Sequence, residues 1–184
     1  MHEQNNSVAI SPRQSRARPV VPTILTVVDP EWLEDQQQEA WIPFVQMLLR
    51  LPSALDSQLQ RDSSMTHFEY IVLVSLSMVE RRRLRLRELA DIAGSSLPRL
   101  SNVITRMEKK EWVMREGDPD DRRSTFAVLT EEGVKQAALA APGHVAAVRG
   151  LVIDQLSAEQ LAVLGEASRL ILHAIDPKPS ALGR

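Results

Sequence analysis

The chain has no cysteine, and glycine is scarce. Without a thiol, disulfides, thiolate metal sites and thiol-based redox sensing are excluded. The four histidines, His2, His67, His144 and His173, are scattered singly, so no metal-ligand spacing is present. With seven glycines and no nucleophile elbow, phosphate-binding loop or metal motif, the sequence predicts a protein that is not an enzyme and needs no cofactor or metal.

Long apolar runs are also missing from the sequence. No run reaches the ~20 residues that span a bilayer, and the N-terminus lacks the apolar core of a signal peptide. We therefore expect a soluble, cytoplasmic protein with no membrane partner. Its 184 residues suffice for one domain, or for two lobes that share a core.

The chain has no large excess of charge of either sign: its formal net charge is -2. The charges are nevertheless unevenly distributed along it. Between Arg81 and Arg123 there are twelve Lys and Arg against eight Asp and Glu, whereas the rest of the chain has ten against sixteen. A basic segment within an acidic chain suits contact with DNA phosphates.

The two ends of the chain differ in pattern. Residues 1–28 contain three prolines and three arginines and show no sustained period, which predicts a disordered, mildly basic tail. Such a tail either has no function or contacts DNA or a partner subunit. Asp29-Pro30-Glu31 then has the composition of a helix start, and helical spacing continues past a kink or break at Pro52.

Two further helices are signalled by their caps. Thr66 can cap a helix rich in apolar residues. Ser157 and Gln160 form a capping box that opens a last helix, which Pro177 ends. Because the apolar residues of this last helix lie on more than one face, we expect one side to contact a second copy of the chain in a symmetric homodimer.

A helix-turn-helix is predicted in the basic segment. A short helix over 87–93 is followed by Gly94, which suits the turn, and by Ser95 or Ser96 as the cap of a second helix with Pro98 in its first turn. The residues expected to point inward are Leu89, Ala90 and Ile92 on the first helix and Leu97, Leu100, Val103, Ile104 and Met107 on the second.

The opposite face of the second helix has the chemistry of a major-groove reader. Arg99, Asn102 and Arg106 lie at i, i+3 and i+7. A guanidinium suits guanine, a carboxamide suits adenine, and hydroxyls suit phosphates. A solvated helix face is the alternative interpretation. The residues predicted to contact the major groove are Ser96, Pro98, Arg99, Ser101, Asn102, Thr105 and Arg106.

A β-hairpin is predicted after this helix, and a very short strand before the first one. The turn Asp118-Pro119-Asp120-Asp121 separates two strand-like runs, so the whole reads as a winged helix. Arg122 and Arg123 then lie near the hairpin tip, within reach of phosphates or of a narrow A·T-rich minor groove. The acids would repel DNA, so one is expected to pair with an arginine. Their spacing does not fit a calcium loop.

From about Ser64 to Gly133 the sequence resembles the MarR family of transcriptional regulators of bacteria and archaea, with weaker similarity over 31–175. The segment "LRELADIAGSSLPRLSNVITRMEKKEWV" matches the helix-turn-helix, and "DPDDRRSTFAVLTEEG" matches the wing. The resemblance implies a mostly α fold with a small β-hairpin (α+β), in which a winged helix-turn-helix lobe joins a helical dimerisation lobe.

The resemblance also implies a function and roles for residues. A homodimeric repressor would bind a near-palindromic operator on double-stranded DNA and be released by a small aromatic or anionic effector. Arg99 and its neighbours would enter the major groove, and Arg122 or Arg123 the minor groove. Asp121 would pair with an arginine to brace the wing.

The chain departs from the family pattern in three places. Glu111 replaces the usual glycine after the recognition helix, and Pro142-Gly143 interrupts a usually long helix, which implies a kink or break. The missing cysteine removes the peroxide sensing of one branch. The predicted organisation is a tail (1–28), an N-terminal dimerisation region (29–65), the winged helix-turn-helix (66–130), C-terminal dimerisation helices (131–176) and a tail (177–184).

A possible ligand pocket is predicted from Trp41, His67, Tyr70 and His144. For each of them, a core aromatic or a hydrogen-bonded histidine is the alternative. Two alternative functions are a winged-helix module that binds protein instead of DNA, and a small hydrolase, for which no catalytic motif is present. Steep salt dependence of binding would distinguish DNA contact from protein contact.

Overall fold

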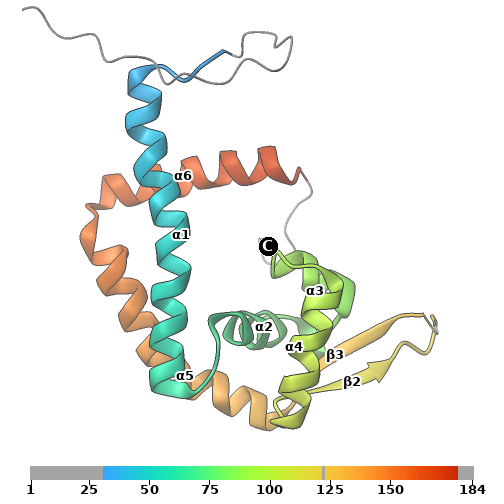
Figure 1. Cartoon of the computed structure of the whole chain (residues 1–184). Helices are drawn as coiled ribbons and strands as arrows, with labels where there is room; N and C mark the ends of the chain where they lie inside the picture. The colour runs from blue at the N-terminus through green and yellow to red at the C-terminus, as the bar shows by residue number, and fades with distance from the viewer. Residues whose placement is uncertain (1–30, 122, 178–184) are drawn as a thin grey trace, which may run out of the picture.

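The computed structural model describes residues 31–121 and 123–177, so Arg122 and the predicted tails, apart from Pro177, lie outside it. The described chain is mainly helical with one small antiparallel sheet, which confirms the predicted fold class (Figure 1). In order, the elements are α1 (Asp35–Ser63), α2 (His67–Ser77), η1 (Glu80–Arg82), β1 (Arg83–Arg85), α3 (Leu86–Ile92), α4 (Leu97–Lys109), β2 (Val113–Gly117), β3 (Thr125–Leu129), α5 (Glu131–Leu151), η2 (Ile153–Gln155) and α6 (Ala158–Ile175).

Helix α1 begins at Asp35 and residues 31–34 are not helical, so the helix does not include Glu31 as predicted; Asp29 and Pro30 lie outside the described residues. Glu34 caps the helix, and its backbone N–H donates to Oε1 of Gln37 at 2.9 Å. This capping box satisfies amides that would otherwise lack a partner, which the Asp-Pro-Glu sequence alone did not reveal. The helix also continues through Pro52 without a break, because that residue is exposed and water can bond the carbonyl that the proline leaves free.

The core forms around α2, which packs against α1, α3, α5 and β3. Thr66 caps α2 as predicted: its Oγ1 accepts from the Glu69 N–H at 3.0 Å. The fully buried members of this core include Leu59, Met65, Val72, Leu73, Leu76, Leu89, Leu100, Ile104, Met107 and Ala127. The core therefore lies between α2 and the helix-turn-helix and holds α4 at the surface.

Helix α5 is one helix through Pro142, so the predicted break does not occur, and the helix bends between its two ends (Figure 1). A Cβ on Gly143 would come within 3.2 Å of Nε2 of Gln58 on α1, so this glycine permits close packing of the two helices. The stretch Glu131–Gln155 is also long and apolar enough to cross a membrane by length and composition, contrary to the sequence expectation. It packs along α1 and α2, and we assign it as a packing helix of the fold.

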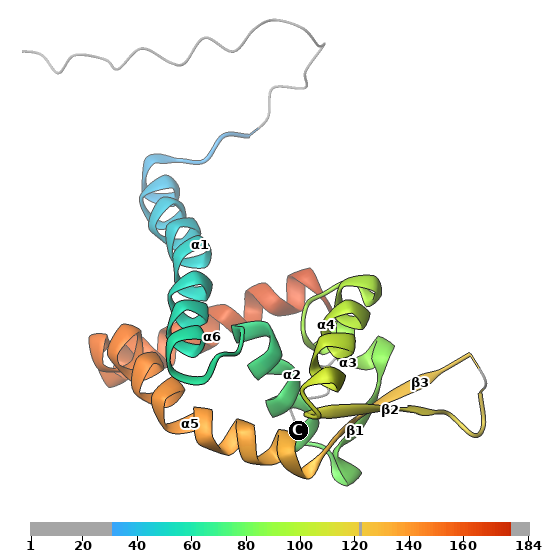
Figure 2. The ribbon, with the colours of Figure 1, turned by 60° about the horizontal axis from the view of Figure 1, so that its bottom comes forward.

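The sheet has the order β1-β3-β2, with both neighbours antiparallel. Arg85 lies opposite Phe126, and Arg115 lies opposite Ala127. The short strand predicted before the first helix is therefore present as β1. The β2–β3 hairpin extends away from the helices in both views (Figures 1 and 2). This is the wing of a winged helix.

A left-handed residue follows the end of helix α4. Glu111 has a φ of 59°, which is the backbone conformation that glycine adopts most easily. The neighbouring Trp112 N–H donates to the Met107 carbonyl at 3.0 Å, as in a helix-closing motif. The exit geometry is thus one that glycine suits, although glutamate occupies the position.

Glu111→Gly is expected to stabilise the fold by up to about 1 kcal/mol, because it relieves the left-handed strain of a side chain while adding backbone freedom to the unfolded state. Urea denaturation of both proteins measures the change in the free energy of unfolding. Glu111→Ala is the matched control, since alanine keeps the strain and should give no gain. Equal stabilisation by both variants would contradict the conformational explanation.

Candidate nucleic-acid interface

Helix α4 is held at the surface by one apolar side. Leu100, Val103, Ile104 and Met107 are buried against the core. Ser96 is the cap, with its Oγ 3.4 Å from the Arg99 nitrogen, and Pro98 lies in the first turn as predicted. Leu97 was predicted to point inward but is 46% exposed, because in the first turn it lies at the edge of the buried stripe.

The exposed surface of α4 divides into a centre and two flanks. With about 100° per residue, Pro98, Asn102 and Thr105 lie opposite the buried side. Arg99 and Arg106 form the flank nearest α2, and the half-buried Ser101 forms the flank nearest the wing. Ser96 precedes the helix and is exposed. The predicted major-groove residues therefore share one accessible surface.

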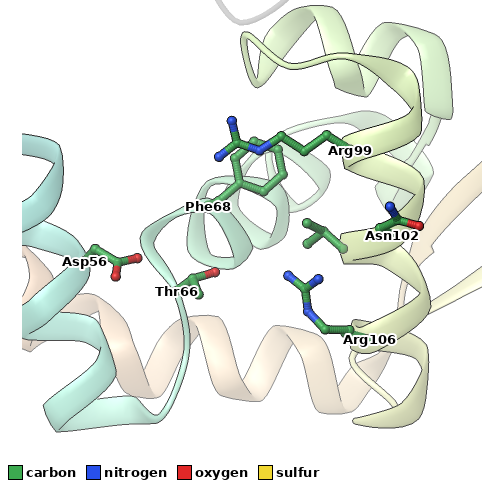
Figure 3. Close-up of a pocket in the computed structure, with 7 residues that line it drawn as sticks. Asp56, Thr66, Phe68, Arg99, Asn102 and Arg106 are labelled. Carbon is green, nitrogen blue, oxygen red and sulfur yellow. The ribbon is translucent and has the colours of Figure 1, made fainter.

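Arg99 packs against α2. Its guanidinium carbon lies 5.2 Å from the centre of the Phe68 ring, within range of a cation–π contact. Arg99, Asn102 and Arg106 also line a pocket of about 530 Å³ (Figure 3), whose other residues are Asp56, Thr66, Phe68 and Val103. The sequence did not reveal Phe68 as a neighbour of α4, because the contact joins residues distant along the chain.

The base of the wing is braced by Asp118. Its Oδ2 accepts from Nε and Nη2 of Arg85 at 3.0 and 2.7 Å. The Arg85 guanidinium holds the pKa of the Asp118 carboxyl below its usual value, with help from the Asp120 N–H. The Asp118 side chain is only 2% exposed, so this carboxylate does not face approaching DNA.

Asp121 was expected to pair with an arginine, and the described residues give it a different partner set. Its carboxylate accepts from the Arg123 backbone N–H at 3.0 Å and from the Ser124 hydroxyl at 2.7 Å. These hydrogen bonds lower the pKa of Asp121. Asp121 therefore shapes the turn by accepting hydrogen bonds from the Arg123 backbone N–H and the Ser124 hydroxyl. The ion pair described at the base of the wing is formed by Asp118. Arg123 is exposed beside this turn, and the predicted role of Arg122 concerns a residue outside the described range.

Arg115 on β2 is a residue that the sequence interpretation missed. Its Nη2 donates to the carbonyl oxygen of Ser101 at 2.9 Å, and its Nη1 forms an ion pair with Glu108. Alternation along β2 places Arg115 on the same side as the buried Val113, and that pattern was the available signal. The wing is therefore attached directly to the recognition helix.

Three of the four predicted pocket residues lie together. The ring of His144 is 5.6 Å from that of His67 and 4.4 Å from that of Tyr70. Trp41 lies apart: it packs on Phe44, and about 22 Å of helix separates it from Asp56, which accepts from the His67 N–H. The sequence did not reveal this separation, because the uninterrupted length of α1 decides how far Trp41 lies from the cluster.

Burial controls the electrostatics of this histidine cluster. Burial lowers the pKa of His67, although the charge of Asp56 acts to raise it. Burial also lowers the pKa of His144, and the charge of His67 lowers it further. Burial raises the pKa of Tyr70. Within the described part of the chain, Nδ1 of His144 is buried without a hydrogen-bond partner. The cluster thus favours neutral imidazoles. No group of residues suited to a metal ion is found in the described ranges.

Comparison with known proteins places this geometry in a family. The model of the MarR family matches residues 65–125. Sco3205, a MarR family transcriptional regulator from Streptomyces coelicolor solved in complex with DNA, is 44% identical, with a TM-score of 0.76 over 81% of this chain and 96% of that chain. AbsC, a MarR family transcriptional regulator from the same organism, is 39% identical, with a TM-score of 0.76 over 81% of this chain and 100% of that chain.

A curated relative agrees with these structures. YfiV from Bacillus subtilis, an HTH-type transcriptional regulator, is 26% identical over 153 residues, which are 82% of this chain and 92% of that protein. These relatives are regulators and not enzymes, so the hydrolase alternative has no support. With its exposed recognition helix and braced wing, the chain belongs to the MarR family of DNA-binding transcriptional regulators.

Proposed function

We propose that the chain is a homodimeric repressor that binds a near-palindromic operator in the cytoplasm and is released by a small ligand. The observation that carries this proposal is the polar, exposed surface of α4 next to a braced wing that carries Arg123. The 44% identity to Sco3205, which was solved with DNA, supports the same use of this surface.

In this proposal α4 enters the major groove and the wing follows the adjacent minor groove. Arg99 and Arg106 supply guanidinium groups for guanine, and Asn102 supplies a carboxamide for adenine. Ser96 and Ser101 lie where hydroxyls can bond phosphates. Arg122 and Arg123 at the wing contact phosphates, and one of them enters the narrow minor groove.

Selection of genomic DNA with the purified protein tests the proposal. We expect the recovered fragments to share a near-palindrome with half-sites about 10 base pairs apart or a multiple of that, because two recognition helices of a symmetric dimer repeat at the helical turn. Transcription from those sites should rise when the gene is deleted. Binding that selects no sequence and does not weaken as salt rises would favour the protein-interaction alternative.

Exposed apolar surface supports the homodimer. None of the residues of α6 is buried, and Leu170, Leu172 and Ile175 are 67%, 63% and 74% exposed. The N-terminal half of α1 also rises clear of the other helices in Figure 2, and Trp41 and Leu49 on it are exposed. Apolar surface of this extent is typical of a protein interface, and a symmetric second copy can cover both helices at once.

Combined Leu172→Glu and Ile175→Glu substitutions, three residues apart on one face of α6, are expected to weaken dimerisation by at least about 100-fold, because each buried leucine or isoleucine is worth about 1.5–3 kcal/mol and a charge must be desolvated in its place. Analytical ultracentrifugation measures the dissociation constant. Lys135→Glu on α5 is the control, since its side chain is already solvated at 67% exposure. A wild-type monomer, or an unchanged dimer in the double variant, would contradict the proposed interface.

Two neighbouring features support ligand response. The pocket of about 530 Å³ is adjacent to the histidine cluster, because Asp56 lines the pocket and also accepts from the His67 N–H. An aromatic anion there could stack on Phe68 and pair with Arg99 or Arg106, and it would then compete with DNA for those side chains. Titration of the protein–DNA complex with benzoate and 4-hydroxybenzoate tests this, and release by neither compound would contradict this choice of ligand.

A further inference from the structure

Arg115 joins the wing to the recognition helix through contacts that the proposed DNA interface does not by itself require. It is the central residue of β2 and lies opposite Ala127 of β3. Its Nη2 donates to the Ser101 carbonyl at 2.9 Å and to the hydroxyl oxygens of Ser101 and Thr105, both at 3.1 Å. Its backbone N–H donates to Oε1 of Glu108 at 3.1 Å, and its Nη1 pairs with the same carboxylate. One side chain therefore spans two turns of α4.

We propose that Arg115 is a positioning residue for sequence-specific DNA binding: it sets the angle of the wing to α4 and directs the Ser101 hydroxyl towards the DNA backbone. This inference rests on the proposed function. It assigns to Arg115 no contact with DNA, because its guanidinium is already engaged by the side chains and carbonyl of α4.

The direction of the Ser101 hydroxyl follows from hydrogen-bond chemistry. Arginine has only donors, so the hydroxyl oxygens of Ser101 and Thr105 must accept from it. The Thr105 hydroxyl then donates to the Ser101 carbonyl at 3.0 Å. Among the hydrogen bonds of residues 31–121 and 123–177, the Ser101 hydroxyl acts only as an acceptor, so its hydrogen remains available. A phosphate oxygen is an acceptor that such a hydrogen can reach.

The location of Ser101 agrees with this use. It lines a groove bounded by α3, α4 and the wing, together with Ser96 at the start of α4 and with Arg123 and Ser124 near the wing tip. A DNA strand that passes between a recognition helix and a wing would run through this groove. The free hydrogen of Ser101 is therefore on the side where phosphates are expected.

The effect of Arg115 on the wing angle follows from the length of the wing. With a strand rise of about 3.3 Å per residue, the wing tip near Asp121 lies up to about 20 Å from Arg115. A tilt of about 10° at Arg115 would move the tip by about 3.5 Å, which is more than half the roughly 6 Å width of the minor groove. Small changes at Arg115 thus determine whether the tip enters the groove.

The other described ion pairs of the wing cannot perform this task. Arg85 pairs with Asp118, and Arg83 pairs with Glu116 at 3.5 Å, so both connect the wing to β1 of its own sheet. Arg115 connects the wing to α4. Removing it would leave the hairpin intact and free its angle to the helix.

Arg115→Lys tests the proposal, because lysine retains the charge but cannot reach three acceptors in one plane. We expect affinity for the duplex recovered by genomic selection to fall about tenfold or more. Affinity for a duplex of unrelated sequence should fall less than operator affinity, and the salt slope should stay at its wild-type value, because lysine keeps the charge and the Ser101 hydroxyl that it no longer directs is neutral. Fluorescence anisotropy at several salt concentrations measures both. Arg83→Lys, which alters an ion pair within the sheet, is the matched control and should retain operator affinity.

A double-mutant cycle strengthens the test. Ser101→Ala in the Arg115→Lys background should cost less than in the wild type, because the hydroxyl is no longer directed. If Arg115→Lys does not fold, as judged by circular dichroism, Glu108→Gln replaces it in the same comparison, since it removes only the ion pair.

The outcomes separate the two proposals. Wild-type operator affinity in Arg115→Lys would overturn the positioning role, and so would an equal loss on both duplexes with a shallower salt slope, which would indicate a phosphate contact. A wild-type protein that selects no DNA sequence would instead overturn the proposed function itself.

Discussion

Arg99→Ala is expected to weaken binding to the selected operator by roughly 5- to 150-fold, corresponding to about 1–3 kcal/mol for a bidentate base contact. Arg99 is exposed in the first turn of α4, on the flank that faces α2. Its contact with Phe68 limits the directions that the side chain explores and so reduces the entropy lost on binding. Base preference should relax at one position of each half-site, as measured by selection from a randomised operator.

The controls for Arg99 separate its charge from its contact with a base. Arg149→Ala removes the same charge from α5, where Arg149 pairs with Asp154, and should leave base preference unchanged. Phe68→Leu keeps Arg99 but removes the ring beneath it, so we expect a smaller loss of affinity with the same base preference. If Arg99→Ala reduces affinity equally for every operator sequence, Arg99 contacts phosphate and not a base edge.

Replacing Arg122 and Arg123 together with alanine should weaken binding across all sequences and make the salt dependence shallower. Each lost phosphate contact changes the slope of log K against log salt by about 0.9, so the slope should change by about 0.9 if one arginine contacts DNA and by about 1.8 if both do. The Asp121 carboxylate shapes the turn through the Arg123 backbone N–H, which alanine retains. The turn should therefore persist, and the loss should report on the side chains.

Single variants at these two positions identify which arginine contacts DNA. The contact residue should account for most of the slope change, while the other variant should behave like wild type. Lys135→Ala on α5 controls for the change in net charge. Unchanged affinity and slope in the double variant would remove the wing arginines from the interface.

The wing shows how far sequence reasoning could reach. One part of its chemistry was predicted: an acid of the loop pairs with an arginine. The identity of the pair was not, because Arg85 lies on β1, far from Asp118 in sequence, and only the β1–β3 pairing brings them together. The same limit explains why Arg115 was missed, since its partners lie on α4.

The pocket residues show a similar limit. His67 and Tyr70 are neighbours on α2, but His144 joins them only because α5 packs against α2. Trp41 shares α1 with Asp56, yet the length of that helix separates it from the cluster. Residue type alone therefore selected the three residues of the cluster but also included Trp41, which lies outside it.

By itself the sequence determined the local features of this protein: the caps of α2, α4 and α6, the turn at Gly94, the hairpin, and the polar side chains of the recognition helix. Each depends on residues within about one or two turns of one another, where spacing decides which groups can meet. Only the tertiary structure decided which arginine braces which acid and that Arg99 packs on Phe68. These contacts join distant segments, and the packing of the core sets their distances.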